Sequence, residues 1–217
     1  MPMSQLNAYL ESIKEEKETK LIPENIVNGV TIMGVPGRTK YCIEVDFSTS
    51  TTSQSGMSNW VTKVNRLDLT KYNGTGVVGA FYGYGRLREA SVIFTNKITN
   101  MGNFFRNCSN LKKVDLSEAD TSNVLDMSYA FSYCYVLEDV TVINATKATV
   151  MNNMFQECRR LTNDSLNNIL MMLADGTAIA SANKTLKYLG LSSDQATICT
   201  TLSNWSAAQA KGWSTGY

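Results

Sequence analysis

Hydrophobic positions in the second half of the chain recur at a fixed spacing. From residue 77 onward, the pattern M-x3-F-x2-C-x2-L appears three times after a degenerate first copy, and successive Phe residues are 24, 26 and 24 positions apart. A period of this length is typical of a solenoid, in which each repeat buries its apolar side only against its neighbours. The four copies are Val77, Phe81, Tyr84 and Leu87; Met101, Phe105, Cys108 and Leu111; Met127, Phe131, Cys134 and Leu137; and Met151, Phe155, Cys158 and Leu161.

A short strand pattern follows the Leu of the repeats. In L-x2-L-x-L the apolar residues point into the core, and the residues between them point outward from a parallel sheet. The Phe and Cys lie in the preceding segment, for which we predict a short helix or a turn. The sequence therefore predicts an α/β solenoid with a parallel sheet over residues 64–192. Its strand patterns begin at Val64, Leu87, Leu111, Leu137 and Leu186.

The N-terminal residues predict an attachment and oligomerisation module over residues 1–40. A helix over residues 4–20 has one narrow apolar stripe, which must pack either on the domain or on copies of itself. A short helix and a strand follow over residues 21–37, and residues 41–63 form a strand and a polar linker. The attachment residues that we predict are Leu6, Leu10, Ile13, Pro23, Ile26, Val30, Ile32 and Val35.

The C-terminal residues predict a helical cap. One helix is expected from Leu166 to Ala174 and another from Ser193 to Leu202, and Trp205 and Trp213 add bulky apolar cover. The last repeat of a solenoid needs such a cap because it would otherwise expose its core. We assign residues 193–217 to the cap.

Composition excludes several kinds of chemistry. The 217 residues contain no His, which removes Ser-His-Asp and Cys-His catalysis and His metal sites. The net charge of +1 gives no general case for nucleic acid or an anionic membrane, and no apolar run approaches the length of a membrane span. The N-terminus has no signal-peptide core, so we expect assembly in a cytoplasm. No phosphate loop, acid–base pair or metal constellation is present, and we predict neither an enzyme nor a cofactor.

The five cysteines predict a structural ladder of free thiols. Cys108, Cys134 and Cys158 occupy the same repeat position, where a small hydrophobic side chain can stack on its copies. A metal site would need convergent ligands, and a disulfide needs a geometry that parallel stacking seldom supplies.

Two segments resemble known families. Residues 111–134, with V-D-L-S, D-T-S-N-V and F-x2-C-x2-L, resemble BspA-like leucine-rich repeats of bacterial surfaces and phages. Residues 20–37, KLIPENIVNGVTIMGVPG, resemble a segment of tail-fibre and baseplate proteins of phages that infect low-GC Gram-positive bacteria, and the ending KGWSTGY is similar to such proteins as well. The resemblance implies a BspA-like leucine-rich repeat fold with an N-terminal helix-plus-strand module and a helical C-terminal cap.

The resemblance also implies a function. We expect a non-enzymatic structural protein of the phage tail, located in the virion, that contacts other tail proteins and a host surface protein or glycan. By analogy with phage fibres it would form a homotrimer. The alternative is a bacterial cell-surface leucine-rich repeat adhesin, against which the missing leader and anchor count.

The outward positions of the sheet are the predicted partner-binding residues. An exposed Tyr there would be the best single anchor, because it offers an apolar face and a hydroxyl group. The alternative is a solvated face whose charges pair across strands for a few tenths of a kcal/mol each. The residues are Arg88, Glu89, Lys112, Lys113, Asp115, Glu138, Asp139, Lys187 and Tyr188.

Overall fold

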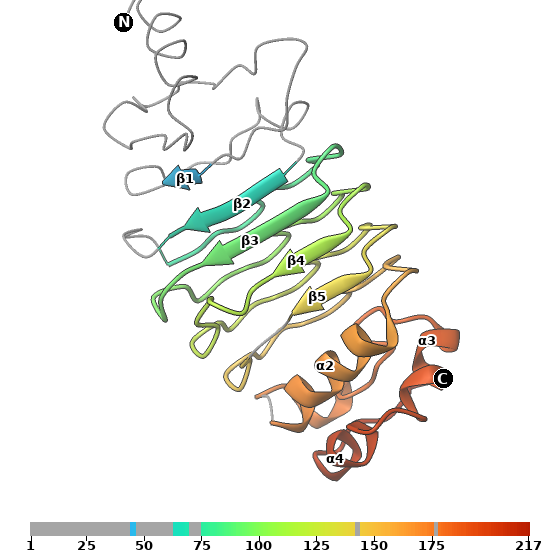
Figure 1. Cartoon of the computed structure of the whole chain (residues 1–217). Coiled ribbons are helices and arrows are strands. Elements are labelled where there is room, and N and C mark those ends of the chain that lie inside the picture. The colour runs from blue at the N-terminus through green and yellow to red at the C-terminus, as the bar shows by residue number, and fades with distance from the viewer. Residues whose placement is uncertain (1–43, 47–62, 70–74, 142–143, 176–177) are drawn as a thin grey trace, which may run out of the picture.

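Five short parallel strands form one sheet within the described part of the chain (Figure 1). The computed structural model describes residues 44–46, 63–69, 75–141, 144–175 and 178–217, with the backbone alone for 44–46 and 63–68. Strands that are neighbours in the sequence are neighbours in the sheet, so the order is β1-β2-β3-β4-β5. The strands are β1 (Glu44–Asp46), β2 (Lys63–Asp68), β3 (Glu89–Ile93), β4 (Lys113–Asp115) and β5 (Asp139–Thr141).

The register of the sheet follows the repeat. Ala90 pairs with Val114, and Val114 pairs with Val140, so equivalent positions of successive repeats lie side by side. All three side chains are buried, while the residues on either side of each remain partly or fully exposed. This alternation is the pattern of a strand with one face on the core.

Tight turns fill the segments that carry the repeat Phe and Cys. The backbone N–H of Phe81 donates to the carbonyl of Phe104 at 2.9 Å, and that of Phe105 donates to Ala130 at 2.7 Å. Phe131 donates to Met154 in the same way, at 2.9 Å. The turns of each repeat are thus hydrogen-bonded to the turns of the next, and their backbone groups are satisfied without a helix.

The core under these turns is a column of phenylalanine rings. Phe81 stacks on Phe105 with 5.1 Å between ring centroids, Phe105 on Phe131 with 5.8 Å, and Phe131 on Phe155 with 5.4 Å. The rings are within 12° of parallel. The repeat spacing found in the sequence therefore brings equivalent Phe residues into contact.

The cysteines of the repeats form a second column. The Sγ of Cys108 donates to the carbonyl of Phe81 at 3.0 Å, that of Cys134 to Phe105 at 3.2 Å, and that of Cys158 to Phe131 at 3.1 Å. Burial raises the pKa of Cys108 to about 12 and raises the pKa of the other two thiols as well. The described cysteines, these three and Cys199, have free thiols and are buried. The predicted structural ladder is confirmed, and Cys42 lies outside the described residues.

Short helices follow the sheet and gather beyond β5 (Figure 1). The hydroxyl of Thr162 accepts from the Ser165 N–H and caps the first helix, and the Ser165 hydroxyl in turn accepts from the N–H of Val140 in β5 at 3.0 Å. The predicted helix near residues 166–174 is confirmed, and the one near residues 193–202 is present but shorter. The elements are α2 (Asn163–Ala174), the 3-10 turn η2 (Ser181–Asn183), α3 (Ser193–Cys199) and α4 (Trp205–Ala210).

The predicted fold class, an α/β solenoid of BspA-like leucine-rich repeats, is wrong. The described residues form a small parallel sheet followed by three short α-helices, and the described connections between β3, β4 and β5 are turns. Residues with positive φ recur in these turns, which a right-handed helix excludes. The strand expected at residues 186–191 is also absent, since that stretch forms a turn. A Cβ on Gly190 (φ 83°) would lie 2.7 Å from the backbone nitrogen of Gln156, so this close contact requires glycine.

The predicted attachment module lies outside the described residues. This applies to the module's eight named residues, from Leu6 to Val35, and to most of the linker at 41–63. The oligomerisation of residues 1–40, the division of the chain into domains and the homotrimer therefore stay predictions.

Candidate functional site

The sheet face holds seven of the nine predicted partner-binding residues. We define the sheet face as the outward residues of β3, β4 and β5 together with the residue before each strand. Register places Glu89, Lys113 and Asp139 side by side in one row, and backbone hydrogen bonds join Arg88, Lys112 and Glu138 in the next.

Charges on the sheet face compensate one another. Lys112 Nζ lies 3.7 Å from a carboxylate oxygen of Glu138, and Arg160 Nη1 lies 3.8 Å from the same oxygen. Asp115 accepts a hydrogen bond from the Ser117 N–H at 2.9 Å, and hydrogen bonding by Ser117 lowers the pKa of its carboxyl group. These contacts fit a solvated face with charge pairs across strands, the alternative interpretation of this surface.

Lys187 and Tyr188 do not lie on the sheet face. They belong to the turn at residues 185–190, where the carbonyl of Tyr188 accepts from the N–H of Asn153 at 2.8 Å. Tyr188 packs partly against the core, and the Lys187 ammonium lies 5.2 Å from the centroid of the Tyr217 ring. Tyr188 is therefore no exposed anchor on the sheet, because α2 takes the place of the next strand.

A different surface, the turn face, carries the unusual chemistry. We define the turn face as the surface of the turns at residues 77–85, 101–109, 127–135 and 151–159. Two residues in each turn have positive φ. Glycine adopts this conformation at no steric cost and asparagine tolerates it, whereas a bulky residue there is a conformational outlier. In chain order the residues are Gly79 and Gly83, Asn103 and Asn107, Tyr129 and Tyr133, and Asn153 and Glu157.

Arg106, in the second turn, lies among three tyrosine rings. Tyr129 and Tyr133 come from the third turn, and Tyr82 comes from the first. The guanidinium carbon lies 4.8 Å from the ring centroid of Tyr129, 5.8 Å from that of Tyr133 and 5.9 Å from that of Tyr82. All three distances are in the range of cation–π attraction. Tyr135 extends the group, with its ring centroid 6.1 Å from that of Tyr133. We call these five residues the tyrosine–arginine cluster.

Side-chain amides complete the cluster. Arg106 donates from Nη1 to Asn103 Oδ1 at 2.9 Å, and Asn107 donates from Nδ2 to the hydroxyl oxygen of Tyr82 at 3.4 Å. The Nε of Arg106 is buried and has no hydrogen-bond acceptor among the described residues. Tyr82 is 50% exposed and Tyr135 is 43% exposed, so the cluster presents aromatic surface to solvent. Most large apolar residues of this domain are, in contrast, buried.

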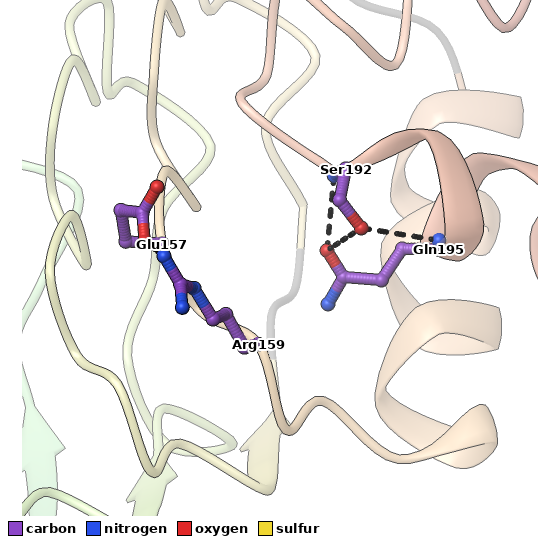
Figure 2. Close-up of polar contacts among 4 residues, drawn as sticks. All are labelled: Glu157, Arg159, Ser192 and Gln195. Carbon is purple, nitrogen blue, oxygen red and sulfur yellow. Dashed lines mark hydrogen bonds and ion pairs between the residues drawn. The ribbon is translucent and has the colours of Figure 1, made fainter.

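The turn face ends where the C-terminal residues cover the last repeat. Figure 2 shows Ser192 and Gln195, whose side chains and backbones form a capping box at the start of α3. The Gln195 side chain also donates to the carbonyl of Cys158 at 2.7 Å. Glu157 and Arg159, which form an ion pair, lie in the fourth turn at this end (Figure 2). The fourth repeat thus carries an ordinary surface ion pair at a position where the third carries a tyrosine.

A comparison with protein-family models matches about half of the chain. The family described as "Mycoplasma protein of unknown function, DUF285" matches residues 75–184, which are 110 of the 217 residues. The chain belongs to the DUF285 family. The match covers β3 to β5, α2 and the whole turn face, so the tyrosine–arginine cluster lies inside the DUF285 region. No curated protein and no solved structure matched the chain.

The side chains of the DUF285 region suit binding by ring stacking and hydrogen bonds. Across the described residues no three or more Cys, Asp or Glu side chains gather as a metal site would require, and no helix there is long and apolar enough to cross a membrane. Asp126 accepts from the Ser128 N–H at 2.8 Å and so caps a turn. The exposed rings and amides of the cluster can stack and form hydrogen bonds.

The sequence did contain a signal for the cluster that a search for catalytic motifs misses. When the DUF285 repeats are aligned on Met, the third reads M-S-Y-A-F-S-Y-C-Y where the second reads M-G-N-F-F-R-N-C-S. Tyrosine replaces asparagine at both turn positions. Without knowledge that these positions have positive φ, the replacement looks like ordinary surface variation.

Proposed function

We propose that this chain is a non-enzymatic attachment protein of a phage tail and that its turn face contacts the host cell. The tyrosine–arginine cluster carries the proposal. Tyr and Arg are enriched in the buried centres of interfaces, and an exposed Tyr contributes contact area at low entropic cost. The sheet face, where charges pair with one another, offers less unpaired chemistry to a partner.

The place in a phage tail rests on the sequence. Residues 20–37 resemble a segment of phage tail-fibre and baseplate proteins, and other tail proteins would contact this part of the chain. Under this proposal residues 1–40 attach the protein to the tail and the repeats carry the contact surface outward. The recognition surface belongs to the repeats because the cluster needs three of them to form.

The test is adsorption of the labelled full-length protein to intact cells of a panel of low-GC Gram-positive bacteria. We expect saturable adsorption to at least one strain, loss in a Tyr129→Asn/Tyr133→Asn double variant, and retention in a Lys112→Ala/Lys113→Ala double variant on the sheet face. Loss in the lysine variant alone would move recognition to the sheet face. Absence of saturable adsorption to every strain would contradict the attachment function.

A second candidate is a bacterial cell-surface adhesin, and the family match favours it. The matched family is described as a Mycoplasma protein, which is a cellular source. Immunogold labelling with antibody against residues 75–184 separates the two. Labelling of tail structures on purified particles supports the phage protein, and labelling of cell envelopes supports the adhesin.

A further inference from the structure

The tyrosine–arginine cluster is organised before any ligand arrives. Arg106 lies among three tyrosine rings and is tied to Asn103, and the Tyr82 hydroxyl accepts from Asn107. The backbone beneath is hydrogen-bonded from repeat to repeat, with Tyr133 donating to Gln156 at 2.7 Å. A surface held in this way loses little side-chain entropy on binding.

The third repeat places its tyrosines where the backbone favours other residues. Tyr129 has φ 56° and Tyr133 has φ 63°, while three of the other repeats' six equivalent residues are asparagine and two are glycine. A bulky residue at such an angle is unfavourable. The sixth equivalent residue is Glu157, which forms an ion pair with Arg159. Tyr129 and Tyr133 differ from it because both rings lie against Arg106, beside the exposed rings of Tyr82 and Tyr135. This grouping favours a role for the two rings in a contact outside the fold.

The size of the cluster favours a small ligand. It spans three repeats, from Tyr82 to Tyr135, and two steps of about 4.8 Å between stacked repeats give about 10 Å in that direction. A stable protein interface buries roughly 800 Å² on each partner, which is far more than such a patch supplies. A ligand of one or a few ring units fits its length.

The chemistry of the cluster favours a neutral ligand with hydroxyl groups. The single positive charge, on Arg106, already faces aromatic rings and an amide oxygen. What remains for a ligand is the electron-rich face of tyrosine rings, which attracts weakly positive C–H groups, together with phenol and amide hydrogen-bonding groups. A sugar ring presents both C–H faces and hydroxyls. We infer that the tyrosine–arginine cluster binds a neutral glycan of the host cell surface, an inference that rests on the proposed attachment function.

The test measures glycan binding by the full-length protein directly. The probes are a printed array of neutral and acidic bacterial oligosaccharides and purified neutral wall polysaccharide from low-GC Gram-positive bacteria. We expect retention of neutral glycans, weakened about tenfold or more in the Tyr129→Asn/Tyr133→Asn variant, because the few residues that dominate binding are enriched in Tyr. Glu157→Asn is the matched control: it changes a left-handed position of the next repeat, outside the cluster, and should leave binding unchanged.

Adsorption to cells separates failure of this inference from failure of the proposed function. If the protein adsorbs to cells, retains no glycan and loses adsorption after the cells are treated with protease, the partner is a protein; the glycan inference is overturned and the attachment function stands. Preference for acidic over neutral glycans, or unchanged glycan binding by the double tyrosine variant, also overturns it. Thermal melts of both variants verify that the fold is intact.

Discussion

The sheet face and the turn face are built on the same repeats, yet their exposed side chains differ in how well they suit the local backbone and their neighbours. On the sheet face, exposed charges pair with those of the neighbouring repeat, as Lys112 and Arg160 do with Glu138. On the turn face, the third repeat places Tyr129 and Tyr133 at backbone angles that favour glycine or asparagine. Because a repeat presents the same position several times, its neighbours act as an internal control. The departure at these tyrosines is therefore informative, whereas the charges of the sheet face fit their surroundings.

The first prediction compares the cores beneath the two faces and has the largest expected effect. Phe131→Ala, under the turn face, should lower the free energy of unfolding by about 3–5 kcal/mol, because it opens a gap between two stacked rings. Val114→Ala, under the sheet face, removes less buried area and should cost about 2 kcal/mol. Both side chains are fully buried. Urea denaturation followed by circular dichroism measures both values.

A control is needed because the Ala variant of Phe131 can fall below the threshold for folding. Phe131→Leu keeps most of the buried volume and should remain folded with a smaller loss. A cost under about 1 kcal/mol for Phe131→Ala would mean that the ring column is not part of the core. Equal costs for Phe131→Ala and Val114→Ala would show that the two faces rest on equivalent packing.

The second prediction concerns the thiol ladder beneath the turn face. Burial raises the pKa of Cys108 from 9.0 to about 12, so the folded protein disfavours the thiolate more than the unfolded chain does. The stability that this provides is complete below pH 9 and is lost as the pH rises towards 12. At pH 10.5 the loss from Cys108 alone is about 2 kcal/mol, since each pH unit above the unfolded pKa costs about 1.4 kcal/mol.

Chemical denaturation at pH 8 and pH 10.5 measures this effect. A Cys108→Ala variant is less stable at pH 8 but should lose about 2 kcal/mol less than the original protein between the two pH values. The other ionisable groups are present in both proteins. The substitution also removes the smaller contribution of Cys108 to the pKa values of Tyr84 and Cys134, which burial raises most. Parallel losses in the two proteins would show that the Cys108 thiol is not shielded from solvent.

Much of the repeat was predictable from the sequence because it depends on periodicity. The Met, Phe, Cys and Leu positions recur, and the structure buries them in columns. The positions of α2 and α3 were predictable from the sequence, although their N-caps are Thr162 and Ser192, and α4 was not predicted. The fold class was not predictable from the sequence. In the segment that carries the repeat Phe and Cys, a pair of turns and a short helix would give the same spacing of hydrophobic residues. The loss of the strand at Leu186 also depends on distant contacts, such as the close approach of Gly190 to Gln156.

The candidate site was less predictable than the fold. The sheet face was identified because alternation in a strand reveals which residues point outward. The tyrosine–arginine cluster joins residues 82, 106, 129, 133 and 135 across three repeats, and only the register of the turns shows that their side chains meet. Lys187 and Tyr188 were misplaced for the same reason, since their position depends on α2 replacing a strand.

The third prediction tests whether the tyrosines of the turn face serve the fold. Glu157→Asn should raise the free energy of unfolding by about 1 kcal/mol, because asparagine tolerates positive φ and the exposed ion pair with Arg159 contributes little. Tyr133→Asn removes the same unfavourable backbone conformation but also loses a cation–π contact of about 0.5–1 kcal/mol with Arg106. Its net effect should lie between zero and a gain of about 1 kcal/mol.

Denaturation of these two variants beside the original protein gives the comparison. A loss of more than about 1 kcal/mol in Tyr133→Asn, with a gain in Glu157→Asn, would show that the tyrosine is retained for stability. That outcome would remove the main reason to regard the third repeat as specialised for binding.

The last prediction returns to the sheet face and has the smallest effect. Glu138→Gln removes the carboxylate that Lys112 and Arg160 share, at 3.7 Å and 3.8 Å, but leaves the backbone carbonyl of Glu138 to accept from Thr162. Exposed ion pairs at this separation contribute about 0–1 kcal/mol, so we expect a loss of a few tenths of a kcal/mol. The difference should shrink further in 0.5 M salt, since screening weakens exposed pairs. A loss above about 2 kcal/mol that persists in high salt would mean that Glu138 is part of a cooperative charge network. The sheet face would then have a structural role as demanding as that of the turn face, and the contrast between the two faces would no longer single out the tyrosines.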